Sequence, residues 1–291
     1  MRQEGGRKAG SLTDCGLRTY CGRGLRLLRT TDADGKAGGG AVAGSARVAL
    51  LSGMSPAPVQ LIKICCIASP DEMQLALHSG ADALGFVSKM PSGPGPIEED
   101  LIASIIALVP AGIATFLLTS ETEATAIIDQ QRRTGANTLQ LVDEVEPGAQ
   151  AVIRNSLPGI RIVQVIHVAD AQSVDEALRV APDVDALLLD SGNPRLAVKE
   201  LGGTGRVHDW SLSREIRERS GLPVYLAGGL KSTNVAEAIA AVRPAGVDVC
   251  SGVRTDGKLD PVKLRAFVGA ARPPVPAVKT ASISLLRAWR A

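Results

Sequence analysis

The sequence predicts an α/β fold of the (β/α)8 TIM barrel class, and three observations support this prediction. From Pro56 onward, short runs rich in leucine or β-branched residues alternate with amphipathic stretches of helical period. About eight such units fit into about 215 residues, which matches a closed barrel. Glycine-rich turns cluster after the late strands, where barrels of this class commonly hold a phosphate.

An open flavodoxin-like or Rossmann sheet is the alternative fold. A Rossmann sheet has a G-x-G-x-x-G motif where its first strand leads into the following helix. No such motif follows the first predicted strand of this sequence. We therefore favour the barrel.

Eight strands are predicted because eight apolar runs are bounded by polar or turn-forming residues. In chain order they lie at 61–66 (LIKICC), 83–87 (ALGFV), 113–118 (IATFLL), 138–142 (TLQLV), 160–168 (IRIVQVIHV), 186–189 (ALLL), 224–227 (VYLA) and 247–250 (VDVC).

Helical patterns lie between the predicted strands. Ser69 is followed by Pro70 and two acidic residues, which is the pattern of an N-cap with proline at the first helical position. From Glu98 to Val109, apolar residues recur with the period of a helix: Leu101, Ile102, Ile105, Ile106 and Leu108.

A barrel domain at residues 56–272 is predicted to carry an extension at each end. We expect residues 1–55 to be disordered, because the first 53 residues hold 9 Lys or Arg against 4 Asp or Glu and lack a sustained apolar period. The alternative is an Arg-rich organelle transit peptide. Acidic residues and the glycines at 38–40 fit that poorly, so we favour an extension upstream of a working start at Met54. Residues 273–291 form a Pro-rich tail.

The composition excludes several classes of protein. A chain of 291 residues with 45% hydrophobic residues can bury a full-sized core. Its five cysteines are too few and too irregular for a disulfide framework, and no His or Cys pair has zinc-ligand spacing, so we expect a reducing, cytoplasmic setting and no metal. The net charge of +2 and the few aromatic residues argue against nucleic acid as a partner. No stretch approaches the roughly 20 apolar residues of a membrane span.

Three glycine-rich turns follow the last three predicted strands. Glycines at such turns let backbone N–H groups approach an anion closely, and the following helix N-termini add partial positive charge. Each turn alone is weak support, because Gly-Gly after a strand is most often a tight turn. Together they predict a phosphate site made of Gly202, Gly203, Thr204 and Gly205 after the sixth strand, Gly228 and Gly229 after the seventh, and Ser251 and Gly252 after the eighth.

Two side chains at predicted strand ends are candidates for chemistry. Asp190 closes the apolar run DALLLD, so it either faces the pocket or forms a turn with Ser191 and Gly192. Cys65 and Cys66 close the first strand, and the alternation of a strand sends one inward and the other toward the helices. A strand cysteine is usually a packing residue, but the phosphate turns favour a functional role for Cys65.

The motifs KICCI, GADALGFV, LQLV, DALLLD, GGTGRVHDW, PVYLAGGL, NVAEAI and GVDVCSGV follow one another in this order. Taken together they resemble the phosphoribosylanthranilate isomerase family of tryptophan biosynthesis, over nearly all of residues 61–268. The resemblance implies a (β/α)8 barrel that uses no cofactor and performs an Amadori rearrangement of a small phosphosugar, N-(5-phosphoribosyl)anthranilate. It further implies that Cys65 is the general base, that Asp190 is the general acid, and that the late glycine-rich loops bind the substrate phosphate.

Several positions depart from the family pattern. Cys66 stands where family members usually have glycine, and the loop after the second strand lacks the usual arginine and offers only Lys89. Gln140 is retained in the fourth strand, but Val142 follows where histidine is usual, and Arg254 replaces an acid after the eighth strand. We expect Lys89, Gln140 and Arg254 to contact substrate. Two alternatives remain open: a paralogous isomerase of another phosphosugar, and a non-catalytic barrel that binds a phosphometabolite. A monomer or homodimer is expected.

Overall fold

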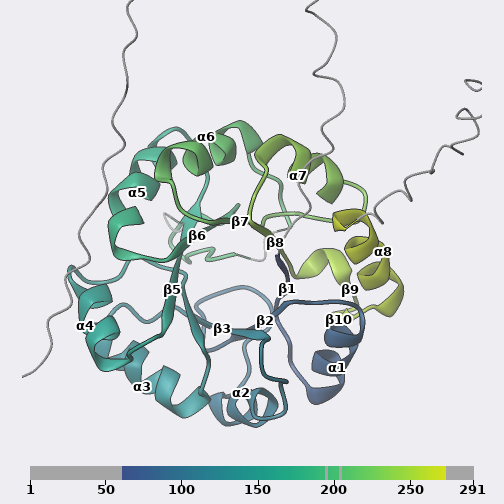
Figure 1. Ribbon diagram of the computed structural model, residues 1–291, viewed down its shortest axis with the longest axis horizontal. Helices are drawn as coiled ribbons and strands as arrows, with labels where there is room; N and C mark the ends of the chain where they lie inside the picture. The colour runs from purple at the N-terminus through teal and green to yellow at the C-terminus, as the bar shows by residue number, and fades with distance from the viewer. Residues whose placement is uncertain (1–60, 194–195, 203–204, 273–291) are drawn as a thin grey trace, which may run out of the picture. The chain divides into compact units, whose positions relative to one another are not determined.

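The computed structural model describes residues 61–193, 196–202 and 205–272. Eight parallel strands close into a barrel in chain order, with helices around it (Figure 1). The strands are β1 (Leu61–Ile64), β2 (Ala83–Val87), β3 (Ala114–Thr119), β4 (Thr138–Leu141), β5 (Arg161–His167), β6 (Ala186–Asp190), β7 (Val224–Leu226) and β8 (Gly246–Val249). The predicted (β/α)8 fold is therefore confirmed.

The barrel closes because β1 pairs with β8 as well as with β2. Leu61 lies opposite Gly246, and Ile64 lies opposite Val249. Strand β1 ends two residues earlier than predicted, since Cys66 has a φ of 63° and leaves the extended conformation. This turn places Cys66 beside the neighbouring strand end of β8.

The helices lie between successive strands along the chain. They are α1 (Pro70–His78), α2 (Glu99–Ile106), α3 (Ala124–Thr134), α4 (Ala149–Ser156), α5 (Gln172–Val180), α6 (Trp210–Ser220), α7 (Val235–Val242) and α8 (Pro261–Ala271), with short 3₁₀ turns η1 (Ala181–Asp183) and η2 (Ser251–Val253) and a two-stranded ribbon of β9 (Arg254–Thr255) and β10 (Lys258–Leu259). The predicted N-cap of α1 is confirmed, because Ser69 Oγ accepts a hydrogen bond from the Glu72 backbone N–H at 3.2 Å.

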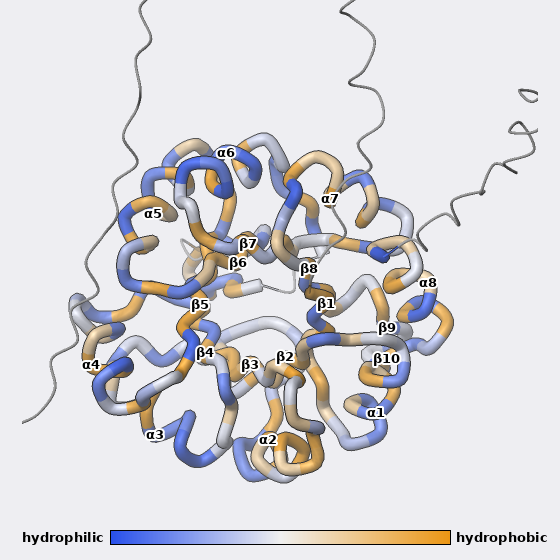
Figure 2. Tube along the Cα trace, in the orientation of Figure 1, coloured by the Kyte–Doolittle hydropathy of each residue, from blue (hydrophilic) through white to orange (hydrophobic). Residues whose placement is uncertain are grey.

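Apolar side chains pack in two places. Most of them, including Ile62, Ile64 and Phe267, fill the layer between the strands and the helices. A smaller cluster fills the barrel interior and includes Phe116, Val165 and Leu188. Figure 2 shows the same arrangement, with largely hydrophobic strands at the centre and helices of mixed character around them.

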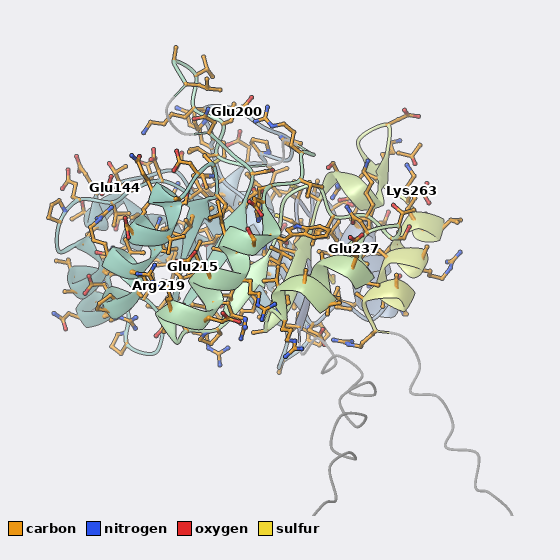
Figure 3. The ribbon with its side chains drawn as sticks, turned by 90° about the horizontal axis from the view of Figure 1, so that it is seen from above. Glu144, Glu200, Glu215, Arg219, Glu237 and Lys263 are labelled. Atoms are coloured by element: carbon orange, nitrogen blue, oxygen red, sulfur yellow. The ribbon has the colours of Figure 1, made fainter. Side chains whose placement is uncertain are left out.

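All eight strands point the same way, so the loops that follow them meet at one end of the barrel. In Figure 3, the loop that carries Glu200 projects from the barrel at this end. The predicted extensions at residues 1–55 and 273–291, like the working start at Met54, lie outside the described residues. Within the described part of the chain, no helix is long and apolar enough to cross a membrane.

Candidate active site

A cavity that is partly open to solvent lies at the end of the barrel where the strands finish. Its wall brings together both predicted catalytic side chains, Cys65 and Asp190. The loops after β2 and β6 meet over it, because Ser92 Oγ donates a 2.5 Å hydrogen bond to the Lys199 carbonyl. Further lining residues include Val87, Leu118, Gln140, Val142, Leu201, Ala227, Asp248 and Cys250.

Cys65 follows β1 directly and its thiol faces the barrel interior. Its backbone N–H donates to the Val249 carbonyl at 2.9 Å, which continues the pairing of β1 with β8. A Cβ atom on Gly85 would lie 2.9 Å from both the Cys65 Sγ and the Lys63 Nζ. The absence of a side chain at Gly85 thus leaves room for a thiol and an ammonium group side by side.

Lys63 and Asp248 form a buried ion pair in the floor of the cavity. The Lys63 Nζ lies 2.9 Å from the Asp248 Oδ2, and their side chains are 1% and 8% exposed. Burial by itself lowers the pKa of Lys63, but the Asp248 carboxylate outweighs it and raises that pKa above its usual value. Burial raises the pKa of Asp248, and Lys63 partly offsets this effect. The Asp248 Oδ1 has no hydrogen-bond partner, so an acceptor is left in the cavity wall.

Asp190 ends β6 and is 9% exposed. Its Oδ1 accepts a 2.7 Å hydrogen bond from the Ser191 backbone N–H. A Cβ atom on Gly202 would lie 2.6 Å from the Asp190 Oδ2, so the loop after β6 packs closely on the carboxylate. Asp190 therefore combines the two roles that the sequence left open, since it organises the turn and also lines the cavity.

The predicted phosphate turns come together at the cavity. Gly228 and Gly229 have φ angles of 79° and 61°, and a Cβ atom on Gly229 would lie 2.6 Å from the Arg206 backbone. This close approach requires glycine. Gly202, Gly205, Ser251 and Gly252 line the same cavity, whereas Gly203 and Thr204 lie outside the described residues. Phosphate binding by these turns stays a prediction.

The three predicted substrate contacts have different positions. Gln140 on β4 is 3% exposed, lines the cavity and has an Oε1 without a hydrogen-bond partner. Lys89 is exposed and lines a separate surface hollow that includes Glu98 and Arg133. The structure therefore brings Gln140 to the cavity but does not bring Lys89 there.

Arg254 anchors the turn after β1 instead of lining the main cavity. Its Nη1 and Nη2 lie 2.8 and 3.0 Å from the two carboxylate oxygens of Glu72. The same Nη2 donates to the carbonyls of Cys66 at 2.5 Å and of Cys65 at 3.3 Å. The guanidinium thus ties α1 to the strand end that carries Cys65, and its contact with substrate stays a prediction.

Replacing Glu72 by glutamine is expected to lower the free energy of unfolding by about 2 kcal/mol at neutral pH, because Arg254 loses two charge-assisted hydrogen bonds. Burial tends to raise the pKa of Glu72, but Arg254 and the backbone donors lower it below 4.5. The stabilisation is therefore present above pH 4.5 and is lost as pH falls through the lower folded pKa. The free energies of unfolding of the wild type and Glu72→Gln should therefore become equal at acid pH, and urea unfolding of both proteins from neutral to acid pH measures this.

Glu218→Gln is the matched control for that variant. Glu218 pairs with Arg214 and Arg217 on the exposed face of α6, where water screens the charges. Its replacement is expected to leave the unfolding curve nearly unchanged. A Glu72→Gln protein as stable as this control would contradict the anchoring role of Arg254.

Sequence reasoning missed Lys63, Asp248 and Cys250, although one signal was present. Lys63 and Asp248 are charged residues inside apolar runs, which is the same anomaly that singled out Asp190. His208 lies near this site as well, because a Cβ atom on Gly228 would be 3.0 Å from its Nδ1 and 3.2 Å from the Asp190 Oδ1. Burial lowers the pKa of His208, its Nε2 lies 2.7 Å from the Ser213 Oγ, and its Nδ1 has no hydrogen-bond partner.

Comparison with known proteins agrees with the fold. The family model described as N-(5'phosphoribosyl)anthranilate (PRA) isomerase matches residues 62–270. The chain belongs to this family. The N-(5'-phosphoribosyl)anthranilate isomerase of Methanosarcina acetivorans is 35% identical over an alignment of 224 residues that covers 72% of this chain and 92% of that relative.

Solved structures of phosphoribosylanthranilate isomerases are similar as well. The enzyme from Thermotoga maritima has a TM-score of 0.62 and 30% identity, covering 72% of this chain and 98% of its own. A second structure, in complex with reduced 1-(O-carboxyphenylamino)-1-deoxyribulose 5-phosphate, has a TM-score of 0.60 and 28% identity over 72% and 97% of the two chains. In this member of the isomerase family, Cys66 has a φ of 63°, a conformation that glycine adopts without strain and that other residues rarely adopt.

Proposed function

We propose that this protein isomerises N-(5-phosphoribosyl)anthranilate to its 1-deoxyribulose phosphate product, with Asp190 as general acid and Cys65 as general base. The observation that carries the proposal is the cavity itself. The carboxyl group of Asp190 from β6, the thiol of Cys65 from the end of β1 and the glycine-rich turns after β6, β7 and β8 all line this one cavity. Membership of the isomerase family supports the same reaction.

Asp190 would act first, on the sugar ring. Protonation of the ring oxygen lets the bond between that oxygen and the anomeric carbon break, and the nitrogen lone pair forms an imine. The Asp190 Oδ1 accepts a hydrogen bond from the Ser191 backbone N–H, and the Asp190 Oδ2 lies against Gly202. This arrangement fixes the direction in which the acid faces.

Cys65 would act next, on the opened sugar. Its thiolate removes the proton from C2 and leaves an enolamine, which tautomerises to the ketone. Only the thiolate is competent as a base. Lys63 supports this role because its ammonium places a positive charge beside the sulfur, where negative charge must be carried.

The remaining polar groups of the cavity would orient the substrate. Gly228, Gly229, Ser251 and Gly252 offer backbone N–H groups for the phosphate. Gln140 and Asp248 supply buried acceptor oxygens without partners, which suit sugar hydroxyls or the anthranilate amine. The structure of a relative in complex with a deoxyribulose 5-phosphate ligand supports a substrate that carries a phosphate.

We also propose that the protein works in the cytoplasm as a monomer or homodimer. The cysteines of the described residues, Cys65, Cys66 and Cys250, are free thiols, which fits a reducing compartment. A relative from Thermotoga maritima is described as a dimeric isomerase from which monomers were made.

The proposal is tested by following the fluorescence of freshly prepared phosphoribosylanthranilate with purified protein. Loss of anthranilate-type fluorescence at a rate proportional to enzyme concentration is expected, with inorganic phosphate as a competitive inhibitor because it occupies the glycine turns. A folded protein that binds ribose 5-phosphate but converts no phosphosugar would instead be a phosphometabolite-binding barrel. Turnover of a different phosphosugar alone would identify a paralogous isomerase.

A further inference from the structure

Two cysteines lie side by side where β1 and β8 end. The Sγ atoms of Cys66 and Cys250 are 2.7 Å apart, although 184 residues separate them in the sequence. The pairing of β1 with β8 brings the two strand ends together, since Ile64 lies opposite Val249, and the turn at Cys66, with a φ of 63°, lets its sulfur reach Cys250. Neighbouring strands are about 4.8 Å apart, which is within the Cα separation that a disulfide spans.

The two thiols differ in acidity. The hydrogen bond between the sulfurs lowers the pKa of Cys250, burial opposes this, and the Arg254 guanidinium lowers it further. The same hydrogen bond, a second one with the Cys65 thiol, and burial raise the pKa of Cys66 well above its usual value. Cys250 is also half-buried and lines the open cavity, so it is the reachable, more nucleophilic sulfur. Cys66 is the adjacent protonated thiol.

The local backbone holds Cys66 toward Cys250. Arg254 binds the Cys66 carbonyl at 2.5 Å, and the Cys66 Sγ lies 3.6 Å from the Pro94 carbonyl. A Cβ atom on Gly95 would lie 2.6 Å from the Cys66 Cβ, so the loop after β2 packs on this residue. The Cys65 sulfur lies beside Lys63 and Gly85 in the barrel interior, but it also interacts with the Cys66 thiol, so variants are needed to assign the partner of Cys250.

We propose that Cys66 and Cys250 are a redox-active thiol pair that a hydroperoxide converts to an intrachain disulfide. The Cys250 thiolate attacks one peroxide oxygen, the O–O bond breaks, and Cys250 becomes a sulfenic acid while hydroxide leaves. The Cys66 sulfur then displaces the sulfenic oxygen, which departs as water with the Cys66 proton. Overall, two thiols and one hydrogen peroxide give one disulfide and two water molecules. This chemistry does not depend on isomerase turnover.

Peptide mapping of the full-length protein tests the pairing. Reduced protein is treated with hydrogen peroxide, its remaining thiols are alkylated, and it is digested with trypsin. Peptide 64–89 carries Cys65 and Cys66, and peptide 232–254 carries Cys250. A crosslink between these two peptides that dithiothreitol reverses is expected. Peroxide treatment that leaves the thiols free, or that stops at a sulfinic acid on Cys250, would overturn the proposal.

Variants identify which sulfur of peptide 64–89 takes part. The crosslink should persist in Cys65→Ser and disappear in Cys66→Gly and Cys250→Ser. Glycine is chosen at position 66 because it adopts the φ of 63° without strain. A crosslink that survives in Cys66→Gly, or a disulfide between Cys65 and Cys66 within one peptide, would contradict the pairing.

Thermal unfolding gives a second measurement that needs no variant. A disulfide that closes a loop of 184 residues restricts the unfolded chain, so the oxidised wild type should unfold about 5–10 °C above the reduced protein. The difference should vanish when dithiothreitol is added before heating. Equal midpoints for the fully crosslinked and the reduced protein would mean that the bond strains the fold, against the proposed geometry.

Discussion

Replacing Asp190 by asparagine is expected to lower kcat for the isomerisation by about 10²- to 10⁴-fold, the range that general acid–base catalysis contributes. Asparagine keeps the size of the side chain and can still accept from the Ser191 backbone N–H. It cannot deliver a proton to the ring oxygen. Cys65→Ser is expected to lower kcat to a similar degree, because a serine hydroxyl is far less acidic than a thiol and does not supply a comparable base.

The two variants should leave KM nearly unchanged, since the phosphate turns and Gln140 remain in place. Steady-state fluorescence kinetics separate kcat from KM, and circular dichroism shows whether each variant is folded. Asp183→Asn is the matched control, because it removes an exposed carboxyl group from the opposite end of β6. Activity of a folded Asp190→Asn protein within about threefold of the wild type would exclude Asp190 as the acid.

The barrel could be predicted from the sequence because it depends on local patterns. Each strand is an apolar run with a turn at its end, and eight such runs define the barrel. Strand ends were less predictable. The continuous apolar run LIKICC gives no sign that Cys66 turns to a φ of 63°, since that conformation depends on contacts with Arg254 and the loop at Pro94.

The predicted acid and base lie in one cavity because both close apolar strands, and strand ends meet at one end of a barrel. The partners of charged residues could not be predicted in this way. Arg254 binds Glu72 across 182 residues of sequence, and Lys63 binds Asp248 across 185. Neither pair has a local signature in the sequence. The expected contact of Arg254 with substrate depended only on its place after the eighth strand. Lys89 was expected to contact substrate because it is the charged residue of its loop. In the structure it lines a surface hollow separate from the cavity.

Lys63→Met is expected to lower the free energy of unfolding by about 3–5 kcal/mol at neutral pH, the usual effect of breaking a buried ion pair. Methionine has nearly the same length as lysine but no charge. It leaves the Asp248 carboxylate, 8% exposed and already lacking a partner for Oδ1, without its only ion-pair partner in the described structure. The contact of the ammonium with the Phe116 ring, 5.2 Å from the centroid, is lost as well.

The pH dependence follows from the raised pKa of Asp248. Burial raises this pKa in the wild type, and removal of Lys63 takes away the opposing effect. A carboxyl group whose folded pKa exceeds its unfolded value destabilises the protein above the unfolded pKa, and this penalty fades as pH falls. Lys63→Met should therefore regain stability relative to the wild type in mild acid. Urea unfolding at several pH values measures the change.

Lys63→Met combined with Asp248→Asn separates charge from packing. The double variant has no buried charge at this position, so it should recover most of the stability that Lys63→Met loses at neutral pH. A double-mutant cycle with Asp248→Asn alone, which leaves the Lys63 ammonium unpaired, gives the coupling energy between the two side chains. Coupling near zero would mean that Lys63 and Asp248 act independently. Strong coupling would show that Lys63 and Asp248 stabilise the fold as a unit, with the Lys63 ammonium held beside Cys65.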